Sequence, residues 1–297
     1  QIETPDGDLN NIVNSFLPYQ IYVCRVLARS SYYQSGGAFG FRDQLQDSIG
    51  LMHINPNILK KQIINCSKRQ FIEGDVLHWW HIFDDDTKIN GVRTRFRDDA
   101  LWLIFGVYEY IRITNDWDIL NLKLPYIFGD VLKPEEKEKY TTFYSCDKFE
   151  TVLEHLRRAM DYSISFGKNG LSHFGGGDWN DGMNRVGENG NGESVWLSWF
   201  LYDNLIKFSE LSKDTSFLEV AKTLKENINK NAWDGEWYFR GVYDDGEKPG
   251  SQNSDECKID LIAQAWSKIS NGGDADKVSI ALKSAYDKLF DKKNSIL

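Results

Sequence analysis

The chain has 297 residues, of which 41% are hydrophobic and 27% charged, and its formal net charge at pH 7 is −9. This is the composition of an ordinary globular protein. An acidic chain without a basic run of five or more residues excludes nucleic acid as a main partner. No apolar stretch approaches the roughly eighteen residues that cross a bilayer, so we expect no membrane partner. The first residues also lack the basic start and apolar core of a signal peptide.

The four cysteines are far apart in the sequence: Cys24, Cys66, Cys146 and Cys257. They form no CxxC pair and no Cys/His spacing that is typical of a metal site. We therefore expect reduced thiols, a cytoplasmic location and no metal. Aromatic residues make up 14% of the chain, and several stand beside Gly, Asp, Arg or His. That pattern favours a polar cleft lined by rings over a purely aromatic core.

Hydrophobic periodicity predicts a succession of helices in chain order. The predicted segments are 9–29, 42–52, 58–67, 98–113, 116–127, 148–167, 194–211, 215–231, 257–269 and 274–290. Residues 71–97 read as a long functional loop and residues 128–147 as a polar connection, while 232–255 allows a short β-hairpin. Since no alternating run predicts a sheet, we expect an all-α toroid of helix pairs around a central cleft, with a globin-like or bundle fold as the alternative.

The glycine-rich stretch 175–192, GGGDWNDGMNRVGENGNG, carries Asp178 and Asp181 with Trp179 and Asn180 between them. Glycine at this density allows close backbone approach and unusual backbone angles. An aromatic ring covers the apolar face of a sugar, while carboxylates bind hydroxyls or move protons. The stretch therefore predicts a carbohydrate site, and a plain surface turn is the alternative.

A second stretch places Asp43 and Asp47 four residues apart, on one face of a predicted helix. Asp43 falls in the first turn, where the helix N-terminus and Arg42 favour its ionised form. Such a carboxylate accepts hydrogen bonds from sugar hydroxyls better than it donates a proton. The third stretch, EGDVLHWWH at 73–81, gathers two acids, His78, His81 and two tryptophans, but its spacing matches no metal motif.

The fourth stretch, GVRTRFRDD at 91–99, alternates Arg93, Arg95 and Arg97. Guanidinium groups suit phosphate. In an extended segment, alternate side chains share a face, so all three arginines are able to point the same way. We expect an anion site here, with a solvated charged strand as the alternative.

Four segments then resemble, in the same order, the glycoside phosphorylases of glycoside hydrolase family 94. They are YQSGGAFGFRDQLQD (33–47), EGDVLHWWH (73–81), GVRTRFRDDALW (91–102) and GGDWNDGMNRVGENGNGESVWLSWFL (176–201). The resemblance covers nearly the whole chain. It implies an (α/α)6 barrel, incomplete over residues 1–297, because the β-sandwich before the barrel and the last barrel helices of the family are missing. It also implies inverting phosphorolysis of β-linked glucosides to α-glucose 1-phosphate and a shortened sugar.

The resemblance also implies site residues. Asp181 corresponds to the general acid of the family, Trp179 lies at its glucosyl subsite, and Asp43 and Arg29 bind the same glucosyl unit. We add as substrate-binding candidates Arg42, Asp178, Asn180, His78 and Trp79, and as phosphate-binding candidates Arg93, Arg95 and Arg97. The expected partners are a β-glucoside or oligosaccharide and phosphate. We expect no cofactor other than inorganic phosphate as co-substrate, and a possible homodimer in the full-length enzyme.

Phosphate is already a charged nucleophile, so a phosphorylase needs an acid and an anion cradle but no base. Asp181, in an aromatic setting beside Asp178, is expected to be that acid. One departure is that the loop SGGAFG before Asp43 lacks the arginine of cellobiose phosphorylases. The alternatives are an inverting glucan hydrolase, with Glu73, Asp75 or Asp98 as base, and a carbohydrate-binding fragment that has lost catalysis.

Overall fold

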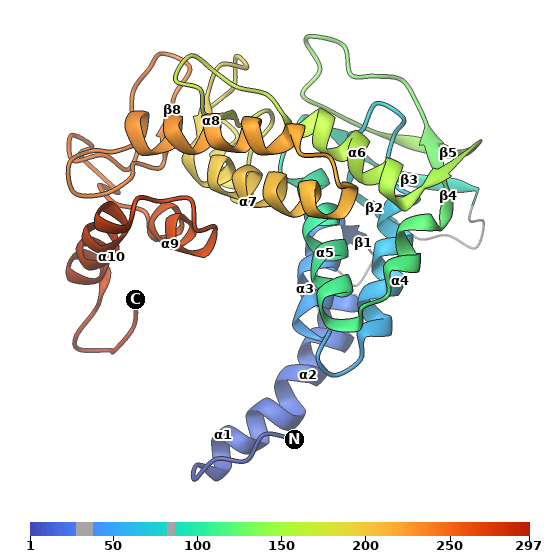
Figure 1. Cartoon of the computed structure of the whole chain (residues 1–297), viewed down its shortest axis with the longest axis horizontal. Helices are drawn as coiled ribbons and strands as arrows, with labels where there is room; N and C mark the ends of the chain where they lie inside the picture. The colour runs from blue at the N-terminus through green and yellow to red at the C-terminus, as the bar shows by residue number, and fades with distance from the viewer. Residues whose placement is uncertain (28–37, 82–86) are drawn as a thin grey trace. The chain divides into compact units, whose positions relative to one another are not determined.

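The computed structural model describes residues 1–27, 38–81 and 87–297. The chain divides into two compact units (Figure 1). The N-terminal unit comprises Gln1–Thr94 and Trp102–Ala159, and the C-terminal unit comprises Arg95–Leu101 and Met160–Leu297. Among the helices of the described residues, none is both long and apolar enough to span a membrane.

The N-terminal unit begins with a nearly continuous helical segment, which confirms the helix predicted for 9–29 as far as Val26; residues 28 and 29 lie outside the described residues. Two π-helical stretches alternate with α-helix: α1 (Gly7–Asn11), η1 (Ile12–Phe16), α2 (Leu17–Tyr19) and η2 (Gln20–Val26). Asp6 caps the start by accepting hydrogen bonds from the backbone of Asp8 and Leu9. Pro18 lies in α2. Because proline has no N–H and its ring crowds the carbonyl four residues earlier, a regular α-helical ladder cannot pass through it.

Four further helices of the chain follow the predicted hydrophobic faces: α3 (Phe41–Gly50), α4 (Pro56–Ser67), α5 (Asp99–Thr114) and α6 (Val152–Ser163). In the N-terminal unit, Leu45 of α3 and Leu59 of α4 are fully buried. Both meet α5 at Gly106, where an added Cβ would lie 3.4 Å from the Leu45 side chain and 3.8 Å from the Leu59 side chain. The core of this unit thus forms where three helices approach closely.

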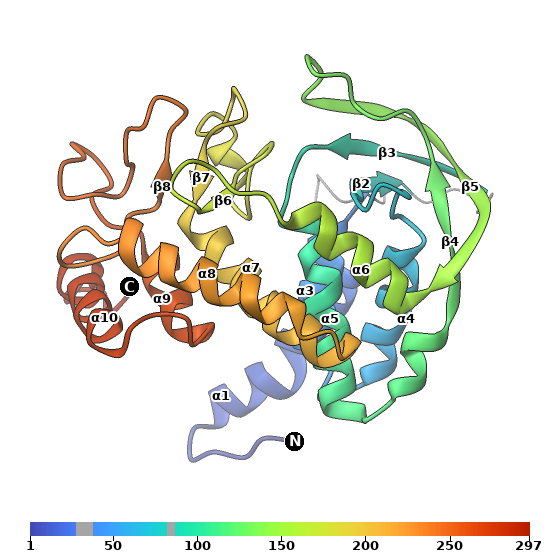
Figure 2. The ribbon, with the colours of Figure 1, turned by 45° about the horizontal axis from the view of Figure 1, so that its top comes forward.

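The prediction of an all-α fold is wrong, because the N-terminal unit contains a five-stranded antiparallel sheet. Its order is β1-β2-β3-β5-β4, and Figure 2 shows β3, β5 and β4 as neighbouring ribbons. The strands are β1 (Ala38–Gly40), β2 (Leu77–His81), β3 (Lys88–Thr94), β4 (Lys123–Phe128) and β5 (Glu138–Thr151). The predicted loop at 71–97 therefore holds two strands, and the predicted helix at 116–127 is a short 3-10 helix, η3 (Trp117–Asn121), followed by β4.

The sheet escaped prediction because its strands carry little alternation of apolar and polar residues. In β5, Phe143 is buried, but Tyr140 and Tyr144 are each more than half exposed. Tyr and Thr favour strands without marking an inner face. In β4, Pro125 argues against a central strand, and β4 is indeed at the edge of the sheet, where a missing N–H is tolerated.

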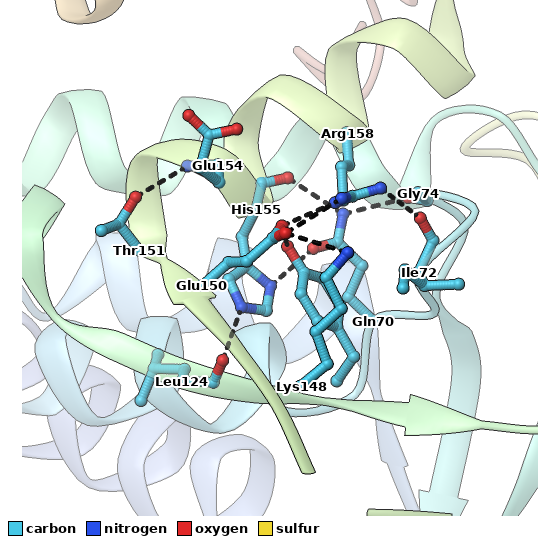
Figure 3. A network of polar contacts seen from close by, with 11 residues as sticks. Gln70, Ile72, Gly74, Leu124, Lys148, Glu150, Thr151, Glu154, His155 and Arg158 are labelled. Atoms are coloured by element: carbon cyan, nitrogen blue, oxygen red, sulfur yellow. Dashed lines mark hydrogen bonds and ion pairs between the residues drawn. The ribbon is translucent and has the colours of Figure 1, made fainter. Parts of the chain in front are cut away.

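A buried histidine joins α6 to the sheet (Figure 3). His155 is fully buried; its Nδ1 lies 2.7 Å from Gln70 Oε1 and its Nε2 lies 3.2 Å from the Leu124 carbonyl. The Gln70 amide nitrogen donates to the carbonyls of Gly74 and His155, which fixes its oxygen toward the ring. Both neighbouring oxygens are acceptors, and a neutral ring has only one N–H to donate. We assign the proton to Nδ1, which makes the shorter contact, so Nε2 then makes no hydrogen bond to the Leu124 carbonyl. The Tyr126 ring stacks on the imidazole at 4.0 Å.

The same region is tied together by an ion pair. Arg158 Nε donates to Glu150 Oε2 at 2.9 Å, and its Nη1 donates to the Ile72 carbonyl at 2.8 Å. The Tyr126 hydroxyl donates to the same Glu150 oxygen. The hydrogen bond from Arg158 lowers the pKa of Glu150 to about 2, so this carboxylate stays ionised. These contacts join β4, β5, α6 and the turn before β2.

We predict that His155 makes the stability of the protein depend on pH. Burial lowers its pKa from 6.5 to about 4. Between these values the unfolded chain binds a proton that the native ring does not, so the stabilising contribution of the ring falls as the pH falls through this window. His155→Asn should be less stable than the parent at pH 7. The difference in unfolding free energy should shrink on acidification, by up to about 1.4 kcal/mol per pH unit between the two pKa values and by less near pH 7.

Urea unfolding of both proteins at pH 7, 6 and 5 measures this difference directly. Titrations shared by the parent and the variant cancel in the comparison. A difference that stays constant between pH 7 and pH 5 would show that His155 has the same pKa in the native and the unfolded chain, and would contradict the prediction.

The C-terminal unit combines a short sheet with helices that match those predicted. The sheet has the order β6-β7-β8. In chain order, the elements of this unit from Ser172 onward are β6 (Ser172–His173), η4 (Asp181–Met183), β7 (Glu193–Ser194), α7 (Val195–Ser212), α8 (Ser216–Asn231), β8 (Gly241–Val242), α9 (Leu261–Ile269) and α10 (Ala275–Leu289). Within 232–255, Trp233 and Tyr238 form a local antiparallel bridge, in keeping with the short hairpin predicted there, while β8 pairs with β7. Helix α7 is buried over most of its surface, including Trp196, Trp199 and Phe200.

Candidate active site

The glycine-rich stretch packs directly on the segment Arg95–Arg97 within the C-terminal unit. Phe96 and Gly175 form an isolated β-bridge, and Gly176 N donates to the Arg95 carbonyl at 3.0 Å. A Cβ on Gly175 (φ +66°) would lie 2.0 Å from that carbonyl oxygen, and one on Gly177 (φ +154°) would lie 2.5 Å from the Phe96 ring. These glycines are therefore required by the close approach of the two segments.

Asp178 is fully buried at the end of this contact. Its Oδ1 accepts a hydrogen bond from Arg240 Nη2 at 2.7 Å, and its Oδ2 lies 2.7 Å from Arg240 Nη1. The Ser194 hydroxyl donates to Oδ2 at 2.6 Å. Because these groups occupy both carboxylate oxygens, the geometry argues against the sugar-binding role predicted for Asp178. It holds the loop instead.

The next three residues are presented outward. Asp178 Oδ1 accepts from Asn180 N at 3.1 Å, and Asn180 Oδ1 accepts from Gly182 N at 3.0 Å, which caps the short helix η4. Trp179 is 43% exposed, and Asp181, at the start of η4, is exposed. The loop thus carries an aromatic ring and a carboxylate at its surface, with the buried Asp178 beneath them.

Two of the three predicted phosphate ligands lie on the segment against which the loop packs. Arg95 and Arg97 are half-buried. The Arg97 guanidinium lies over the Tyr162 ring, 4.8 Å from its centroid. Burial, followed by the charge of Arg97, lowers the pKa of His173, which favours the neutral form of this imidazole. The sequence had not indicated His173, whose Nδ1 lies 2.9 Å from the Ser165 hydroxyl oxygen.

In the N-terminal unit, Asp43 lies in the first turn of α3, as predicted. Its carboxylate folds back over Gly40, where a Cβ would lie 2.2 Å from Oδ2. Arg25, which the sequence did not indicate, bridges Asp43 at 3.2 Å and Asp47 at 2.9 Å. Burial raises the pKa of Asp47 to about 6. Arg42 is buried.

The remaining predicted sugar ligands of this unit lie on β2 or outside the described residues. His78 and Trp79 are half-buried in β2. The Trp79 ring lies 5.4 Å from the rings of both His81 and Tyr140. Arg29 falls outside the described residues. The sugar-binding roles of His78 and Trp79 stay predictions.

Arg93 differs from the other two arginines because it is buried in an ion-pair network of the N-terminal unit. Its Nε and Nη2 donate to the two oxygens of Asp75 at 2.6 and 2.7 Å, and Nη2 also donates to Glu73. Its Nη1 donates to the carbonyls of Gly129 and Asp130. All five N–H groups are thus engaged, which argues against the phosphate-binding role predicted for Arg93. Burial alone would lower the pKa of Arg93, but the carboxylates of Asp75 and Glu73 raise it.

Arg93→Met should therefore act on stability. Removing the guanidinium leaves the Asp75 carboxylate buried without its partner, which costs about 3 to 5 kcal/mol. Urea denaturation measures the loss. Arg112→Met is the control, because Arg112 is half exposed and pairs with Glu109 on one helix face; it should cost less than about 1 kcal/mol. Equal losses in the two variants would contradict a structural role for Arg93.

Comparison with known proteins places these features in a family. Residues 1–297 match the model of the glycosyl hydrolase 94 superfamily, catalytic domain. The chain belongs to this superfamily. Within the described residues of this superfamily member, no group of three or more His, Cys, Asp and Glu side chains is arranged to hold a metal ion.

Two curated relatives and one solved structure illustrate the glycosyl hydrolase 94 match. The chain is 42% identical to the cyclic beta-(1,2)-glucan synthase NdvB of Rhizobium meliloti (strain 1021), over 100% of this chain and 11% of NdvB. It is 30% identical to solabiose phosphorylase of Paenibacillus borealis, over 97% of this chain and 34% of that enzyme. The chain thus spans about a tenth of one relative and about a third of the other.

A rhamnosidase from Klebsiella oxytoca with rhamnose bound shares the fold. The TM-score is 0.63 at 12% identity, over 96% of this chain and 48% of the rhamnosidase. The match to a catalytic domain places the chain among the enzymes of the glycosyl hydrolase 94 superfamily.

Two residues that organise the loop were missed by the sequence reasoning. Ser194 precedes a hydrophobic helix and accepts a hydrogen bond from Leu197 N at 3.0 Å, so it was recognisable as a helix cap. Arg240 stands alone in the aromatic segment WYFRG, and its only sequence signal is a charge among buried rings. Its partner Asp178 is 62 residues away, a distance that no local pattern spans.

Proposed function

We propose that this chain supplies catalytic residues for the inverting phosphorolysis of β-linked glucosides, giving α-glucose 1-phosphate and a shortened sugar. One observation carries the proposal. The loop that presents Trp179 and Asp181 packs against the segment that bears Arg95 and Arg97. A ring for a sugar, a carboxylic acid and two cations for phosphate therefore belong to one packed substructure. Relatives named phosphorylases support the same reaction class.

The proposed chemistry needs only the sugar and phosphate. The carboxyl group of Asp181 donates its proton to the glycosidic oxygen as the bond from that oxygen to the anomeric carbon breaks. A phosphate oxygen attacks the anomeric carbon from the opposite face, so the β-linkage becomes an α-phosphate ester. The sugar-hydroxyl role of Asp43 stays a prediction. No base and no cofactor are required.

The side chains proposed for a hydrolase are less suited to act as base. Asp98 is fully buried. Asp75 is buried and paired with Arg93, and Glu73 contacts the same guanidinium. A base for inverting hydrolysis must hold a water opposite the acid, so these contacts favour phosphorolysis over hydrolysis.

We propose further that the helices form part of an (α/α)6 barrel. Helix α7 is buried on most of its surface, whereas α8 buries one stripe that includes Phe217, Leu224 and Ile228. An inner helix followed by an outer, amphipathic one is the repeating unit of such a barrel. The likeness to the rhamnosidase is in keeping with this proposal.

The similarity to a synthase of cyclic β-1,2-glucan suggests the first linkage to test. The full-length protein should release α-glucose 1-phosphate from β-1,2-linked glucose oligomers only when phosphate is supplied. Oligomers with β-1,3 and β-1,4 linkages serve as comparison substrates. Release of free glucose without phosphate would indicate a hydrolase, and binding without turnover would indicate a carbohydrate-binding protein.

Asp181→Asn should reduce phosphorolysis by at least about a hundredfold, because the amide cannot donate the proton that the leaving oxygen needs. Sugar binding and thermal stability should change little, since Asp181 is exposed in η4. Steady-state rates and calorimetric titration with the sugar measure the two effects. Turnover close to that of the parent would remove Asp181 from the role of acid.

Replacing Arg95 or Arg97 by Met should raise the KM for phosphate more than the KM for the sugar in at least one variant, because an acidic chain needs local positive charge to hold the anion. Lys283→Met is the control for loss of one positive charge, since Lys283 is exposed and pairs with Asp287 on α10. If neither arginine variant changes the phosphate KM relative to this control, the anion is held by other residues.

A further inference from the structure

We propose that Arg240 is a positioning residue for the loop Trp179–Asp181, which it fixes through Asp178. The proposal rests on the proposed function, because the group to be positioned is the proposed acid, Asp181. Arg240 is 3% exposed and therefore does not itself meet the substrate from solvent. Its effect on the reaction would be transmitted entirely by the carboxylate that it holds.

Arg240 holds Asp178 through a bidentate contact. The two terminal nitrogens of Arg240 each lie 2.7 Å from a different oxygen of the carboxylate. A planar guanidinium makes such a forked contact, whereas a lysine ammonium holds only one oxygen well. Because Asp178 is fully buried, water cannot replace the contact if the arginine is removed.

Arg240 is itself held from several sides. The backbone N–H of Arg240 donates to the Pro249 carbonyl at 2.8 Å. Its backbone carbonyl accepts from the N–H of Val195, the first residue of α7, at 3.2 Å. Its Nε lies 3.2 Å from a carboxylate oxygen of Asp260, which caps α9 by accepting from Ile262 N. The side chain therefore extends from a fixed backbone, between the starts of two helices.

The neighbouring residue Tyr238 strengthens this anchor. Gln264 of α9 accepts from Tyr238 N at 2.9 Å and donates to the Tyr238 carbonyl at 2.7 Å. A side chain amide that brackets one residue in this way holds the local backbone as a strand partner would. The segment that carries Arg240 is thus attached to α9 by hydrogen bonds that do not involve the loop.

From Asp178 the restraint passes to the acid in two short steps. Asp178 accepts from Asn180 N, and Asn180 in turn accepts from Gly182 N on the far side of Asp181. The backbone on both sides of Trp179 and Asp181 is therefore fixed by hydrogen bonds that start at the buried carboxylate. If Asp178 moves, the ring and the acid move with it.

A positioning role predicts a loss in turnover that exceeds the loss in sugar affinity. A displacement of about 1 Å in a catalytic group is able to cost about a hundredfold in rate. Arg240→Met should lower kcat by about ten- to a hundredfold, with a much smaller change in the KM for the sugar. Arg240→Lys keeps the charge but not the fork, so its kcat should fall between those of the parent and the Met variant.

The decisive variant removes both charges. In Asp178→Leu/Arg240→Met no buried charge remains unpaired, so thermal stability should recover relative to Arg240→Met. The hydrogen bonds to Asn180 N and to Ser194 are lost in the double variant. Under the proposal, kcat stays low although Tm recovers. A kcat that recovers together with Tm would overturn the proposal and make the pair merely structural.

Amide hydrogen exchange provides a readout that does not depend on turnover. Peptides covering 176–183 should lose protection in Arg240→Met and in the double variant of the full-length protein. Lys207→Met is the control, because it breaks a different ion pair of the same unit, the partly buried pair with Asp203, outside the loop. It should leave the exchange of 176–183 unchanged. Unchanged exchange of 176–183 in Arg240→Met would overturn the proposal.

These measurements separate the two proposals. If the parent protein shows no phosphorolysis on any tested glucoside, the proposed function fails, while the exchange data still decide whether Arg240 fixes the loop. If the parent turns over and the Arg240 variants keep the parent kcat, the function stands and the positioning role fails.

Discussion

In the C-terminal unit, the position of the glycine-rich loop depends on one buried carboxylate, that of Asp178. An ionised group removed from water is stable only where other groups replace its solvation. Arg240 and Ser194 provide that replacement, and each also contacts the start of α7. The requirement to satisfy one charge therefore fixes the relation between the glycine-rich loop, β7, β8 and the helix that follows. This buried contact therefore also determines the position of the exposed residues of the loop.

In the N-terminal unit, the buried polar side chains of Arg93 and His155 find their hydrogen-bond partners in different ways. Every N–H of the Arg93 guanidinium donates to a carboxylate or a backbone carbonyl, so the side chain links β3 to the turn before β2. His155 is held neutral, with Gln70 aligned by its own hydrogen bonds. Both arrangements connect strands to segments outside the sheet. They are internal supports of this unit, which leaves Asp43, on α3, as its strongest predicted contact to a sugar.

The sequence predicted the helices well and the sheet not at all, for physical reasons. Helices such as α8 and α10 bury one stripe, so their hydrophobic period is visible in the sequence. Strand β5 buries little of its surface, and β4 contains a proline, so neither produced a strand pattern. At the site, the first-turn position of Asp43 follows from local sequence and was predicted. The partners of Asp43 and Asp178 are 18 and 62 residues away, and three similar arginines could not be told apart before their burial was known.

The edge strand β4 has a consequence for association of the protein with itself. An exposed strand edge offers N–H and C=O groups to which another chain is able to add a strand. In β4, Pro125 has no N–H to offer, and Ile127 N is already used by the Gln70 carbonyl at 3.0 Å. The middle of this edge therefore lacks the donors that a foreign strand would need. Pro125, which weakened the strand pattern of β4 in the sequence, thus protects the folded sheet against edge-to-edge aggregation.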